Sequence, residues 1–167
     1  MDDEGGACEK RNAGAARATQ PFIAFADDDM IVGADCLGKM LGALQSAHEP
    51  IGYAYSDHLT IPWPAAPAVD QRLEAFQSRP FDPAALRRGN YINTLSLMLR
   101  RVFPGFDPKI RRFQDWDLWL TLLERGVHGV YVPGFLFVNV TIDLGITASE
   151  PNAESMAAVR KKHGLFT

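Results

Sequence analysis

The stretch "PFIAFADDDM", residues 21–30, runs an apolar segment directly into three consecutive aspartates. Residues 22–26 are unbroken by polar side chains and too few for a helix, so they predict a short buried strand. Side chains alternate between the two faces of a strand. If the strand continues through residue 29, Asp27 and Asp29 point to one side and Asp28 to the other.

Helical patterns flank this strand on both sides. Residues 7–18 are rich in alanine and carry lysine and arginine, which favours a helix with a small-residue face. Residues 33–47 predict a second helix, whose apolar face contains Leu37, Met40, Leu41 and Leu44. A helix, a strand and a helix in this order are typical of an α/β sheet with parallel strands.

Two interpretations of the aspartates are open at this point. They can be a solvated acidic turn that also caps the helix from residue 34, because aspartate is favoured near helix N-termini. They can also bind Mg²⁺ or Mn²⁺, which prefer oxygen ligands and commonly take one or two carboxylates plus substrate phosphates. Ligands of open α/β sheets bind beyond the carboxyl ends of the strands, so the preceding strand favours the metal.

The segment "FQDWDLWL", residues 113–120, begins the clearest helix, which we expect over 114–126. Asp115 and Asp117 lie at its start, where they can cap the helix and interact with its dipole. Alternatively, one of them faces a cleft and removes a proton from a hydroxyl group. The spacing alone favours the capping role. Trp116 and Trp119 are expected in the core.

The rest of the chain predicts a few further elements. Strands are expected at 51–61, 92–100, 128–132 and 135–140, a capped helical turn at 81–90 and a terminal amphipathic helix at 152–164. Irregular loops are expected at 62–68 and 101–110, which contain several prolines.

The composition limits the classes of protein that fit. The chain has 167 residues, 47% of them hydrophobic, and a net charge of -3, which suits one globular domain and gives no sign of a nucleic-acid partner. The two cysteines, Cys8 and Cys36, form no metal-binding motif and suit a reducing compartment, so we expect a cytoplasmic protein. No stretch is apolar enough to span a bilayer, so any membrane association is expected to be peripheral.

Taken together, "FADDD" and the later "QDWDLWL…RG…YVP" resemble the bacterial family 2 glycosyltransferases of the GT-A type. The upstream "GACEKRNAGAARAT" is similar to the Arg-Asn-x-Gly helix of that family, and "FDPAALRRGNYI" to its middle segment. The resemblance covers about residues 5–147. It implies one α/β domain over residues 1–167 with a GT-A-like, Rossmann-like mixed sheet flanked by helices. It also implies transfer of a sugar from a nucleotide-diphosphate donor to a sugar or lipid-linked acceptor, usually with inversion.

The resemblance also implies roles for individual residues. Asp29 and Asp27 are expected at a divalent cation, Mn²⁺ or Mg²⁺, because the three aspartates match the family's DXD motif. Asp27 and Asp28 are expected at the nucleotide, together with Arg11 and Asn12 of the first helix, because the same motif also serves the donor. The acid of the family's Glu-Asp pair, which acts as the catalytic base, corresponds to Asp115.

The sequence departs from the family pattern in three places. The opening strands of the type "VSIIIPTYN" are not found, so the domain is expected to lack the first strands of its nucleotide-binding half and to expose a sheet edge through which it could self-associate. Gln114 stands where the family often has glutamate, and no Arg-x-His segment follows "YVP". A non-catalytic remnant that serves as an interaction domain is therefore the alternative to an enzyme. A Mg²⁺-dependent phosphoryl-transfer or nuclease site is less favoured, because no Walker motif or basic surface accompanies the carboxylates.

Overall fold

The structure is a computed structural model that describes residues 6–48, 50–62, 73–141 and 152–165. Its helices are α1 (Ala7–Arg17), α2 (Cys36–Ser46), α3 (Pro83–Arg88), α4 (Gln114–Glu124) and α6 (Asn152–Lys162), with a short 3-10 helix, η1 (Arg100–Val102). Its strands are β1 (Phe22–Ala24), β2 (Met30–Val32), β3 (Ile51–Pro62), β4 (Glu74–Phe76), β5 (Leu97–Leu99) and β6 (His128–Thr141). Most of the predicted loop at 62–68 lies outside the described residues.

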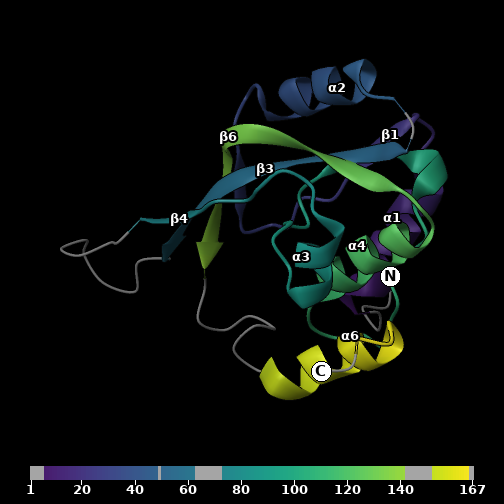
Figure 1. The fold of residues 1–167 in the computed structure, drawn as a ribbon. Helices are drawn as coiled ribbons and strands as arrows, with labels where there is room; N and C mark the ends of the chain where they lie inside the picture. The colour runs from purple at the N-terminus through teal and green to yellow at the C-terminus, as the bar shows by residue number, and fades with distance from the viewer. Residues whose placement is uncertain (1–5, 49, 63–72, 142–151, 166–167) are drawn as a thin grey trace.

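The strands form one mixed sheet in the order β1-β5-β3-β6-β2, with β4 paired to β3 (Figure 1). The long strands β3 and β6 are parallel, whereas β1 pairs antiparallel with β5, and β2 pairs antiparallel with β6. The prediction of a mixed sheet flanked by helices is confirmed. The expectation of parallel strands from the first helix-strand-helix pattern is wrong for β1, because its neighbour is β5 and not a strand reached by a helical crossover.

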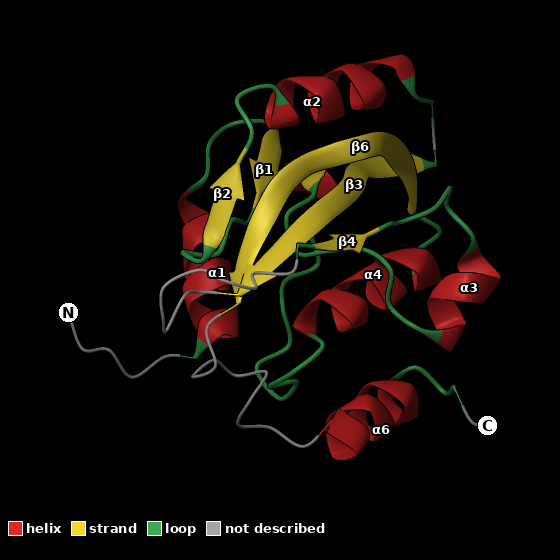
Figure 2. Cartoon of the chain, turned by 90° about the vertical axis from the view of Figure 1, so that its left-hand side faces the viewer, coloured by secondary structure: helices red, strands yellow, loops and turns green. Residues whose placement is uncertain are grey.

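Helices cover both faces of the sheet. Helix α2 lies on one face, and α3 and α4 lie on the other, with α6 beyond α4 on the side away from the sheet (Figure 2). Alternation along β3 divides the core accordingly, because Tyr53 and Tyr55 pack toward α3 and α4 whereas Ala54 packs toward α2. Trp116 and Trp119 of α4 are fully buried, as predicted.

Several boundaries differ from the predicted ones. The two strands expected at 128–132 and 135–140 are one continuous strand, β6, and the strand expected at 92–100 is reduced to β5. On α2, Met40 and Leu44 are buried as predicted. Leu37 is exposed, and the neighbouring Cys36 is buried in its stead. Both cysteines are free and buried. Within the described residues, no helix has the length and apolar character needed to cross a membrane.

Candidate functional site

The three aspartates lie in a turn, so the strand predicted at 22–26 does not continue through residue 29 and does not set the direction of their side chains. Strand β1 ends at Ala24, and the backbone amide of Met30 donates to the carbonyl of Asp27 at 3.3 Å. The chain then reverses into β2, and Val140 of β6 donates to the carbonyl of Asp29 at 2.7 Å. Nor do the aspartates cap the next helix, which begins at Cys36 behind Asp35. Asp27 is half-buried in this turn, whereas Asp28 and Asp29 are exposed.

Arg11 joins this turn to the start of α4. One guanidinium nitrogen donates to Gln114 Oε1 at 2.5 Å, and the other forms an ion pair with Asp27. The guanidinium also lies over the ring of Phe106, 5.4 Å from its centroid. Two motifs that are distant in the sequence therefore meet at a single side chain of α1.

Asn12, the next residue of α1, holds the loop that contains Phe106. Its amide donates to the carbonyl of Phe106 and accepts from the amide of the same residue, both at 2.8 Å. This pair of hydrogen bonds uses both functional groups of the Asn12 side chain. Its contact with a nucleotide stays a prediction.

Asp115 has a separate set of partners. Its carboxylate accepts from Asn90 Nδ2 at 2.7 Å and from the backbone amide of Trp116 at 2.9 Å. Burial raises the pKa of Asp115, and these hydrogen bonds and the charge of Arg11 oppose the increase without cancelling it. A carboxylate whose pKa lies above the ordinary value is better suited to accept a proton near neutral pH.

The backbone enters α4 through an uncommon conformation. Phe113, which precedes Gln114, is left-handed with φ 60° and ψ 34°, and its side chain makes no capping hydrogen bond. Left-handed non-glycine residues cost free energy and are concentrated at functional sites. Asp115 and Asp117 lie in the first turn of α4 and not at the N-cap, so the predicted N-capping role is wrong for both, although their charges still suit the helix dipole.

Asp117 does not share a site with Asp115. Its side chain is only 3% exposed and binds Lys162 and His163 at the C-terminal end of α6. Of the two acids in "QDWDLWL", the structure therefore leaves Asp115 as the candidate base.

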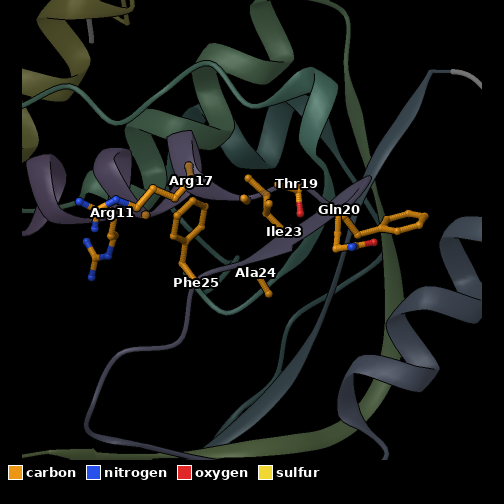
Figure 3. A pocket seen from close by; sticks show the side chains of 11 residues that line it. Arg11, Arg17, Thr19, Gln20, Ile23, Ala24 and Phe25 are labelled. Carbon is orange, nitrogen blue, oxygen red and sulfur yellow. The ribbon is translucent and has the colours of Figure 1, made fainter.

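A cavity of about 580 Å³ runs between α1 and the outer edge of β1 (Figure 3). Arg11 and Phe25 lie toward one end of it, and Thr19 and Gln20 lie toward the other. Because Arg11 also binds Asp27, the cavity is adjacent to the aspartate turn. It thus offers apolar walls, hydrogen-bonding groups and positive charge beside a cluster of carboxylates.

The aspartate turn suits a cation only together with further ligands. In the described part of the chain, no three His, Cys, Asp or Glu side chains gather into a group that could hold a metal ion. Partial desolvation raises the pKa of Asp29, and the neighbouring charges of Asp27 and Asp28 raise it further, so negative charge gathers at this turn. The residues therefore fit a Mg²⁺ or Mn²⁺ ion that takes one or two carboxylates from the protein and the remaining oxygens from phosphates or water.

Sequence reasoning assigned no role to three residues of this site. Gln114, noted only as a departure from a family pattern, is the partner of Arg11; Asn90 binds Asp115; and Phe106 lies under the guanidinium. A long-range pairing of this kind leaves no local pattern. The one available signal was that Gln114 directly precedes the candidate base.

Comparison with known families identifies the family to which this chain is similar. The family described as glycosyl transferase family 2 matches residues 2–104, which is more than half of the chain. The matched region includes α1, the aspartate turn and Asn90, whereas α4 lies beyond it. No curated protein matches the chain.

Proposed function

Because this chain belongs to glycosyl transferase family 2, we propose that it transfers a sugar from a nucleotide-diphosphate donor to an acceptor hydroxyl, with inversion and with Asp115 as the base. Members of the family act on a donor and an acceptor, and they commonly use a divalent cation. The observation that supports the proposal most directly is the pair of contacts made by Arg11. They connect Asp27 of the aspartate turn to Gln114, which precedes Asp115 in the first turn of α4.

In the proposed reaction, the acceptor oxygen attacks the anomeric carbon of the donor sugar. The bond from that carbon to the diphosphate breaks, and Asp115 takes the proton of the acceptor hydroxyl. Asn90 orients the carboxylate through its hydrogen bond, and burial of Asp115 favours proton uptake. Because the oxygen attacks from the side opposite the leaving group, the configuration at the anomeric carbon inverts.

The donor is proposed to lie in the cavity along α1 and β1. Arg17 and Arg11 supply positive charge suited to a diphosphate, and Thr19 and Gln20 offer hydrogen bonds to the nucleoside. Asp29 and Asp27 would hold Mg²⁺ or Mn²⁺, which when bound offsets the negative charge of the departing diphosphate. Asp28, exposed in the same turn, stays a candidate nucleotide contact.

Calorimetry tests the donor site directly. UDP, GDP and dTDP are titrated into the protein with and without Mn²⁺, and one of them is expected to bind only in the presence of the metal. The Asp29→Asn variant should lose this binding, whereas Asp35→Asn, which alters an exposed aspartate paired with Lys39, should retain it. If no nucleotide binds although circular dichroism shows a folded protein, the donor proposal fails and the alternative of a non-catalytic interaction domain is favoured.

A further inference from the structure

The C-terminal helix α6 is held on α4 by contacts that the proposed reaction does not use. Val159 of α6 is fully buried in the core cluster formed with α3 and α4, and Met156 and Leu165 pack against that cluster. Figures 1 and 2 both place α6 on the outer side of α4. At the end of this helix, the consecutive residues Lys162 and His163 reach across to α4 and its neighbouring loop.

The ring of His163 lies between two carboxylates. Nδ1 is 2.7 Å from Glu124 Oε1, Nε2 is 2.9 Å from Asp117 Oδ1, and the side chain is 2% exposed. A neutral imidazole carries one N–H, whereas the imidazolium carries two. Both contacts can be hydrogen bonds only in the charged form. In the neutral form, one ring nitrogen would direct its lone pair at a carboxylate oxygen.

The surrounding charges also favour the imidazolium. Lys162 Nζ donates to Asp107 at 2.8 Å and to Asp117 Oδ2 at 2.9 Å, so this cluster contains three carboxylates and one permanent cation. On the side of α1, Cys8 contacts the carbonyl of Asp107, and burial raises the pKa of this thiol to about 11, so it carries no charge near neutral pH. A protonated His163 leaves the cluster with one excess negative charge, and a neutral one leaves it with two.

From this geometry we infer that His163 is a pH-sensitive clamp: in its charged form it bridges Asp117 and Glu124 and fixes α6 on α4, and its deprotonation loosens α6. The clamp itself is independent of the proposed function. It also bears on that function, because Asp117 and Asp115 belong to the same first turn of α4.

The direction of the pH effect follows from linkage. Burial lowers the pKa of His163, but the hydrogen bonds to Asp117 and Glu124 outweigh it, and the net pKa is raised above the ordinary value of 6.5. A group whose pKa is raised by docking contributes its full stabilisation below the undocked pKa and loses it as the pH rises through the docked one. Helix α6 should therefore be held most firmly below about pH 6.5.

Nuclear magnetic resonance on the intact chain tests this inference. The ring protons of His163 should titrate above pH 6.5, and those of His58 provide an internal contrast, because burial lowers the pKa of His58 to about 4. Over the same pH range, the amide protection factors of residues 152–162 should fall about tenfold for each unit by which docking raises the pKa of His163. A titration midpoint of His163 at or below pH 6.5, or amide protection of α6 that is independent of pH, would overturn the inference.

Variants separate the clamp from general packing. The side chain of His163→Gln has both N–H groups on one nitrogen and cannot bridge the two carboxylates as the two ring nitrogens of His163 do, so α6 should show low protection without the pH step. Lys162→Met should weaken docking, whereas Lys161→Met, which alters the exposed neighbouring residue, should not. If His163→Gln fails to fold, the titration of the unmodified chain still decides the outcome.

Discussion

Removing the guanidinium of Arg11 tests how strongly the two motifs are joined. Arg11→Met retains much of the aliphatic stem but deletes the hydrogen bond to Gln114 and the ion pair with Asp27. Hydrogen bonds that involve a charged group contribute roughly 1.5–3 kcal/mol each. The Arg11 and Asp27 side chains are 19% and 32% exposed, which places each interaction near the lower end of that range. We therefore expect the free energy of unfolding to fall by about 3 kcal/mol.

The measurement is urea unfolding followed by circular dichroism, with thermal unfolding as a second readout. For a chain of this size, a loss of about 3 kcal/mol corresponds to a decrease in Tm of roughly 6–12 °C. Arg17→Met is the matched control, because Arg17 belongs to the same helix but is exposed, and its effect should stay within about 0.5 kcal/mol.

A double-mutant cycle isolates the ion pair itself. If Arg11 and Asp27 are coupled as the structure indicates, Arg11→Met and Asp27→Asn should show an interaction energy of about 1 kcal/mol or more. A loss below about 1 kcal/mol for Arg11→Met, or additive effects in the cycle, would refute the reasoning that this side chain holds the site together.

Three further results are expected. Asp115→Asn should lower sugar transfer at least about 100-fold while leaving nucleotide binding intact, and an active variant would exclude Asp115 as the base. The raised pKa of Asp115 means that the folded state disfavours its ionised form. The free energy of unfolding of the unmodified chain should therefore fall relative to that of Asp115→Asn as the pH rises above about 4. A difference between the two proteins that stays constant with pH would contradict this. Gly129→Ala should lower the free energy of unfolding in urea by roughly 1–3 kcal/mol, because the new Cβ would lie 2.5 Å from an aromatic ring of β3. The control Gly42→Ala, on an exposed and open part of α2, should raise the free energy of unfolding by roughly 0.5–1 kcal/mol. Similar effects of the two substitutions would refute the packing argument.

The elements that the sequence predicts well are those specified by local pattern. Helices α1 and α4 begin and end close to the predicted residues, because alanine content, apolar spacing and a terminal glycine act within one segment. The turn at Asp27 is different. Its aspartates follow an apolar run that reads as a longer strand, and the reversal is stabilised by pairing with β6, more than a hundred residues further on.

In the candidate site, too, residue types follow from local sequence whereas their contacts depend on distant segments. The residue types at Asp27, Asp29 and Asp115 were recognisable, but their connection through Arg11 and Gln114 depends on residues that are 103 positions apart. Likewise, the sequence treats Asp115 and Asp117 as equivalent acids at a helix start. They differ in the structure because α6, reached only at the end of the chain, covers one of them.

The parallel pairing of β3 with β6 constrains the order in which this protein can fold. Ile51 lies opposite His128, and the chain between them contains α3 and α4, so the centre of the sheet closes only after a long loop has been ordered. Contacts between such distant residues carry a large closure entropy and slow folding. During synthesis, β3 has no parallel partner until β6 leaves the ribosome. The turn of the aspartates must also wait for β6, because β2 pairs with that same strand. The aspartate turn is thus completed late in folding, and until then one edge of β3 stays unpaired, which favours association of incompletely folded chains.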